Sequence, residues 1–69
     1  MSSTFHAEKV VENYQPRPGA MDSRTVWVVY PDHVAGYGHA CDRVARAIGR
    51  GRTRREALAA AGLTVADLA

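Results

Sequence analysis

This sequence has few of the features that hold small proteins together or carry them to a membrane. Its single cysteine excludes an intrachain disulfide, and its Cys and His residues lack the spacing of a zinc finger. No apolar run approaches the ~18 residues of a membrane span, and the first residues lack the pattern of a secretory leader. These absences, together with one unpaired thiol, lead us to expect a soluble cytoplasmic protein.

Large apolar side chains are also scarce. The 69 residues include eight Val, three Leu, one Ile, two Met, one Phe, one Trp and three Tyr, beside twelve Ala. A chain this short builds one core at most, and burial of so few side chains about balances an ordering entropy of ~1.5 kcal/mol per residue. We therefore expect a single small domain over residues 1–69 that gains stability from self-association or from a partner.

Charge of both signs is present but unevenly distributed along the chain, whose net charge is +2. Residues 1–42 carry three basic and five acidic side chains, whereas residues 43–69 carry six arginines and two acidic side chains. Such a cluster is typical of a protein that contacts a phosphate backbone, although a solvated helical face would have the same composition. The six arginines are Arg43, Arg46, Arg50, Arg52, Arg54 and Arg55.

Two interpretations are open for the N-terminal segment. Apolar side chains from Ala7 to Tyr14 recur at helical spacing, which favours a helix over residues 4–14, whereas two adjacent valines and the tyrosine also suit a strand. The next segment, 15–24, contains two prolines and a glycine within four positions, which predicts a loop or a mobile arm.

Residues 25–30, TVWVVY, are β-branched or aromatic throughout and precede a proline, which predicts a strand. Both faces of this strand are apolar, because successive side chains point to opposite sides. Such a strand is either covered on both faces within the chain or completed by another chain. We expect self-association through this strand, with an interface formed by Thr25, Trp27 and Val29.

The C-terminal half is expected to be helical. Asp32 can cap a helix whose apolar positions continue to Ile48, although Gly36 and Gly38 weaken its first turn, so a start near Gly38 is the alternative. A second helix is predicted over 53–61 by a Thr-x-x-Glu capping box with Gly62 behind its end. A short turn then closes the sequence. The predicted fold class is α+β: an N-terminal helix or strand, one central strand, two helices and a C-terminal turn.

The segment 24–61 resembles the ribbon-helix-helix family of DNA-binding regulators. The resemblance rests on a strand that ends at Pro31, a helix, a glycine turn and a capped helix that begins at Thr53, so that residues 25–61 form a strand-helix-helix core. It implies that two chains pair these strands into a ribbon that enters the major groove. It also implies that the N-terminus of the second helix holds a phosphate.

Catalytic and metal-binding chemistry is not indicated. His39 and Cys41 would diverge by about 200° on a helix, so they do not form a metal site with His33. Cys41 lies on the apolar stripe of the predicted helix, and the sequence places no base beside it. We expect no enzyme, no metal and no cofactor.

These patterns predict a small, dimeric, cytoplasmic nucleic-acid-binding protein that regulates transcription and contacts DNA phosphates. The alternative is a protein–protein interaction module, such as a phage- or mobile-element-like inhibitor or adaptor, that binds an acidic protein through the strand around Trp27. The sequence predicts no membrane contact for either. The expected nucleic-acid-binding residues are Arg46, Arg50, Arg52, Thr53, Arg54 and Arg55.

Overall fold

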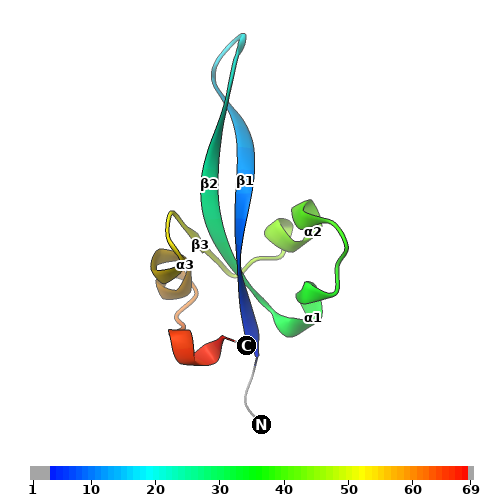
Figure 1. Ribbon diagram of the computed structural model, residues 1–69, viewed down its shortest axis with the longest axis vertical. Helices are drawn as coiled ribbons and strands as arrows, with labels where there is room; N and C mark the ends of the chain where they lie inside the picture. Colours follow the sequence, from blue (N-terminus) through cyan, green and yellow to red (C-terminus); the bar gives the residue numbers. More distant parts are fainter. Residues whose placement is uncertain (1–3, 69) are drawn as a thin grey trace.

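The computed structural model describes residues 4–68 and contains a three-stranded antiparallel sheet with short helices on both faces (Figure 1). The first two strands form a long hairpin, and the short third strand pairs with the second, in the order β1-β2-β3. The elements are β1 (Phe5–Arg17), β2 (Ala20–Pro31), α1 (Asp32–Ala35), α2 (Ala40–Ala45), β3 (Gly49–Gly51), α3 (Arg54–Ala60) and a 3-10 turn, η1 (Val65–Asp67).

The predicted arrangement of elements is wrong at the N-terminus. The segment that favoured a helix is the strand β1, and the single central strand expected over 25–30 belongs to β2, one of three strands. In β1, Val10 is buried while its neighbours Lys9 and Val11 are exposed, which is the period of two of a strand. The segment pairs with β2 along the full length of that strand, and this pairing selects the strand over the helix. The spacing of side chains within the segment does not reveal such a pairing.

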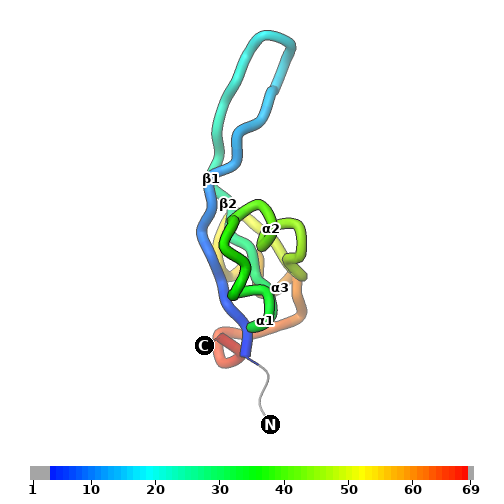
Figure 2. The backbone as a smooth tube through the Cα atoms, turned by 90° about the vertical axis from the view of Figure 1, so that its right-hand side faces the viewer, coloured from blue at the N-terminus to red at the C-terminus, as the bar shows by residue number. Residues whose placement is uncertain are grey.

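The segment 15–24, expected as a loop or arm, forms the distal end of the hairpin. Only Pro18 and Gly19 make the turn, and Gly19 adopts a φ of 79°, in the left-handed region that glycine favours. The strand register is irregular between Tyr14 and Arg17, which accommodates Pro16 at the sheet edge. The hairpin end projects beyond the helices (Figures 1 and 2).

Both faces of β2 are covered within this chain. On one face, Val26, Val28 and Tyr30 pack with Val10 of β1 and with Val34 of α1. On the other face, α3 and the C-terminal residues cover the strand, as the opposite positions of α3 and of α1 and α2 in Figure 1 show. A second chain is therefore not needed to explain the two apolar faces of this strand.

The long first helix expected from Asp32 to Ile48 is two short helices. Gly36 and Gly38 lie in the segment between α1 and α2, where two glycines disfavour a continuous helix. Ile48 lies outside both helices, and its backbone N–H donates to the carbonyl oxygen of Val29 at 2.8 Å. The end of the predicted helix thus directly precedes β3, which begins at Gly49.

The second helix is confirmed as α3. The Thr53 hydroxyl accepts a hydrogen bond from the Glu56 N–H at 3.1 Å, and the Glu56 carboxylate accepts one from the N–H of Arg52 at 2.9 Å. At the other end, Gly62 has a φ of 73° and the Leu63 N–H bonds the Leu58 carbonyl at 2.9 Å. This is the Schellman geometry that a glycine after the helix predicts.

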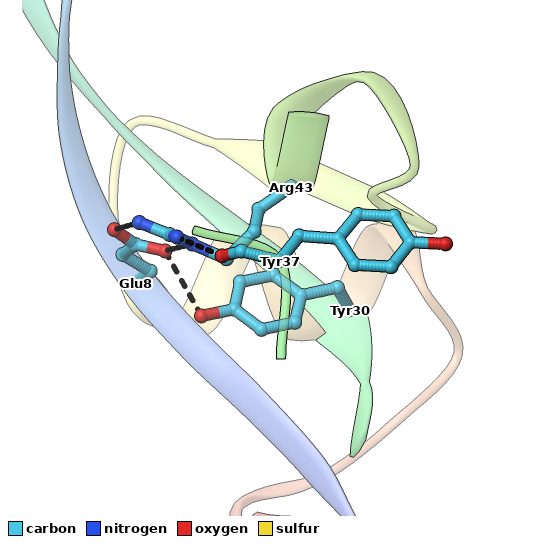
Figure 3. A network of polar contacts seen from close by, with 4 residues as sticks. All are labelled: Glu8, Tyr30, Tyr37 and Arg43. Atoms are coloured by element: carbon cyan, nitrogen blue, oxygen red, sulfur yellow. Dashed lines mark hydrogen bonds and ion pairs between the residues drawn. The ribbon is translucent and has the colours of Figure 1, made fainter. Parts of the chain in front are cut away.

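A polar network joins the hairpin to the segment that contains α2 (Figure 3). The Arg43 guanidinium donates to both carboxylate oxygens of Glu8, at 2.7 and 2.9 Å, and to the carbonyl oxygen of Tyr37 at 2.6 Å. The Tyr30 hydroxyl donates to the same carboxylate at 2.9 Å. One of the six clustered arginines therefore serves the fold, because a bidentate pair of this kind fixes α2 against β1.

This network makes stability depend on pH. The Arg43 guanidinium lowers the pKa of Glu8 below its ordinary value of 4.5, with help from the Tyr30 hydroxyl and against the effect of burial. A carboxyl group whose pKa is lower in the folded than in the unfolded state stabilises the fold at any pH above its ordinary pKa. This stabilisation is lost as the pH falls through the pKa of the folded state. We expect the free energy of unfolding to fall more steeply below pH 4.5 than in Glu8→Gln, measured by urea titration at each pH. Equal slopes would contradict the expectation.

Candidate nucleic-acid interface

The clustered arginines do not form one surface. Arg43 forms an ion pair with Glu8. Arg46, just after α2, has its guanidinium carbon 4.6 Å from the centre of the Tyr37 ring and a guanidinium nitrogen 4.0 Å from a carboxylate oxygen of Asp42. Arg50 lies in β3, and Arg52 in the turn that follows it. Thr53 caps α3, and Arg54 and Arg55 occupy its first turn.

Two of the predicted nucleic-acid-binding residues line one surface groove. This groove has a volume of about 560 Å³ and lies where β3 ends beside β2. Arg50 and Arg52 contribute to it from the β3 side, and Arg24 and Tyr14 from the hairpin. Neither Arg54 nor Arg55 lines it. The groove is completed by Thr25, Val26, Gly51 and Glu56.

The groove carries positive charge beside an aromatic ring. The Arg24 guanidinium lies 5.0 Å from the centre of the Tyr14 ring, a cation–π distance. Glu12 forms an ion pair with Arg50 and lies 3.9 Å from Arg24, so one carboxylate serves two arginines. Among residues 4–68, no acidic side chain forms an ion pair with Arg52. The positive charge in the groove is therefore only partly neutralised.

The start of α3 offers less to a phosphate than the sequence implies. The backbone N–H groups of Glu56 and Arg52 already donate to side chains of the same turn. The Glu56 carboxylate also lies at this end of the helix, where it takes the favourable position that an anion would occupy. Two backbone amides at this end of α3 are thus already occupied, and the arginine side chains carry the positive charge that an anion would meet here.

The residues predicted to form an interface are mostly covered by the chain itself. Val29 is fully buried against Ala57 and Leu58 of α3, and Trp27 packs half-buried against the same cluster. Only Thr25 is exposed, at the wall of the groove. The face that the sequence left for a second chain is occupied by α3.

Sequence reasoning missed Arg24 and Tyr14 as groove residues. Both fall outside the arginine cluster, and both lie in or beside the segment interpreted as a loop. If residues 12–26 had been interpreted as a hairpin, the period of two would have placed Tyr14 and Arg24 on the same face as Glu12 and Val26. Glu12 lies opposite Arg24 in the strand register, so this pattern could have predicted that these residues lie close together.

Comparison of the chain with protein-family models, with curated proteins and with solved structures finds no match in any of the three. Within residues 4–68, no helix is long and apolar enough to cross a membrane. The same part of the chain contains no group of three or more His, Cys, Asp or Glu side chains placed to hold a metal ion. The geometry of the groove is therefore the basis for assigning a function.

Proposed function

We propose that this protein binds nucleic acid through the groove formed by Tyr14, Arg24, Arg50 and Arg52. The observation that carries the proposal is the convergence of three arginines, from β2, β3 and the turn after β3, beside one tyrosine ring. These residues are up to 38 positions apart in sequence, so the fold and not local composition brings them together.

The chemistry of the groove suits a phosphate-bearing chain. Guanidinium groups bind phosphate oxygens through two parallel N–H donors, and they remain charged at every physiological pH. A half-buried aromatic ring among cationic side chains, such as that of Tyr14, offers a surface on which a base can stack, and base stacking is worth ~1–3 kcal/mol. An acidic protein segment would use the arginines but not the face of the ring.

Glu12 sets a limit on the affinity. Its carboxylate already pairs with Arg50, so an incoming phosphate must compete with it for that guanidinium. Arg52, which no acidic side chain of residues 4–68 engages, is the residue whose charge is most available. We therefore expect Arg52 to contribute more to phosphate binding than Arg50.

The test is a titration of labelled duplex and single-stranded DNA at low and moderate salt, with fluorescence anisotropy as the readout. Arg52→Gln should weaken binding roughly tenfold at low salt and reduce the salt slope by about one phosphate contact. Arg46→Gln is the matched control, because it removes the same charge from outside the groove. The proposal fails if the unmodified protein shows no salt-dependent binding, or if the two variants lose equal affinity.

A further inference from the structure

The outer edge of β1 is long and open. β1 is an edge strand of 13 residues, and among residues 4–68 its outer side makes one isolated bridge, between Phe5 and Leu68. An edge of this length presents unpaired N–H and C=O groups that another strand can pair with. Natural edge strands are usually short or covered for that reason.

An apolar groove runs beside this open edge. It lies between β1 and α2, has a volume of about 330 Å³, and is lined mainly by Val10, Val11, Ala40, Cys41 and Val44. Val11 is 69% exposed, and no residue of α2 is buried in the single chain. Free backbone groups and an apolar wall together form the kind of site that accepts an added strand.

The chain exposes more surface than a compact monomer of its size, which favours a second copy as the partner of this edge. The chain exposes 4885 Å², whereas a compact protein of 7.5 kDa is expected to expose about 4250 Å². Its radius of gyration is 13.1 Å, against about 11 Å for a compact chain of 69 residues. The excess surface approaches the ~800 Å² that each partner buries in a stable complex. We propose that a second copy of this chain pairs with β1 in antiparallel orientation.

The charges on β1 select one register for this pairing. In an antiparallel pair of identical strands, a two-fold axis passes through one residue, which faces its own copy. A residue a given number of positions before the axis faces the residue the same number of positions after it in the other copy. Like charges that face each other in this way repel. With the axis at Lys9 or at Glu12, that charged side chain faces the same side chain of the other copy. With the axis at Val10, Glu8 of one copy faces Glu12 of the other. An axis at Val11 avoids all three and brings two exposed valines together. Among these four central positions of β1, the charges therefore favour a dimer centred on Val11.

This inference is independent of nucleic-acid binding, and it moves self-association from β2 to β1. Residues Trp27–Val29 of β2 have strand partners on both sides, β1 and β3, so they have no free edge. The longest open edge of the same sheet is the outer side of β1, which is 13 residues long. The dimer would form one continuous six-stranded sheet and leave Arg50 and Arg52 of each groove on the β3 side, away from the paired edge.

Cross-linking tests the register. In a Cys41→Ser background, Val11→Cys should form a disulfide-linked dimer on mild oxidation, because the two side chains face each other across the axis. Lys9→Cys is the matched control: its two copies would be four residues apart along the strands, about 13 Å, which is too far for a disulfide. Cross-linking of the second variant as fast as the first would overturn the register.

Sedimentation tests the dimer itself. The unmodified chain should sediment at twice its monomer mass, and Val11→Asp should sediment as a monomer with an unchanged circular dichroism spectrum, because Val11 is 69% exposed in the single chain. Met21→Asp, at a side chain 71% exposed in β2, should remain a dimer. A monomeric unmodified chain, or a loss of dimer in both variants, would overturn the proposal.

Discussion

Gly49→Ala should destabilise the protein by about 3 kcal/mol, close to the whole stability of a chain this small. A Cβ at this buried glycine would lie 2.4 Å from the carbonyl oxygen of Ala57 and 2.8 Å from the Cβ of Ala61. Both neighbours belong to α3 or its cap, and backbone atoms cannot turn aside as a flexible side chain can. The helix must therefore move away from β3, and the apolar cluster beneath it must open.

Gly38→Ala is the control for that experiment. A Cβ at Gly38 meets no atom within 4 Å, and its backbone does not have a positive φ. This variant should unfold at the same urea concentration as the unmodified protein or slightly higher, because alanine reduces the freedom of the unfolded chain. Urea unfolding followed by circular dichroism compares the two. Equal midpoints for Gly49→Ala and Gly38→Ala would show that α3 does not depend on close approach to β3.

Glu8→Gln should cost about 2 kcal/mol at neutral pH. The carboxylate accepts three hydrogen bonds, two from Arg43 and one from Tyr30, and the amide that replaces it carries no charge and has only one acceptor oxygen. The Arg43 side chain, 18% exposed, would then lack its counter-charge. The loss should appear as a lower urea midpoint and as weaker ordering of α2, which the pair ties to β1.

Glu12→Gln is the matched substitution on the same strand and the same face. Glu12 pairs with Arg50, whose side chain is 50% exposed, and water screens a pair of that kind, so we expect a change below about 1 kcal/mol. The same variant should strengthen DNA binding, because it frees Arg50 in the groove. A larger loss of stability for Glu12→Gln than for Glu8→Gln would show that the network in Figure 3 is not the one that holds the sheet to α2.

Some of the site could be predicted from the sequence and some could not. The arginine cluster includes Arg50 and Arg52, which line the groove; their role in binding stays a prediction. It also included Arg43, which serves the fold, and Arg46, which stacks on Tyr37. Charge along a chain does not distinguish these roles, because the acidic partners of Arg43 and Arg50 lie on β1, more than 30 residues away, and are brought near only when the sheet forms.

The sequence by itself determined the features that depend on interactions between residues only a few positions apart. The capped start of α3 at Thr53, its end at Gly62 and the strand character of 25–30 depend on bonds or steric preferences between near neighbours. These features are present in the structure as the residues predict.

Only the tertiary structure decided the rest. Residues 4–14 could form a helix or a strand, and pairing with β2 selects the strand; the expected helix from Asp32 breaks at its glycines so that Ile48 and β3 can pair with Val29. The two apolar faces of β2 are covered by helices of the same chain. In each case the choice depends on contacts between residues far apart in sequence, whose free energy exceeds the small differences between local conformations.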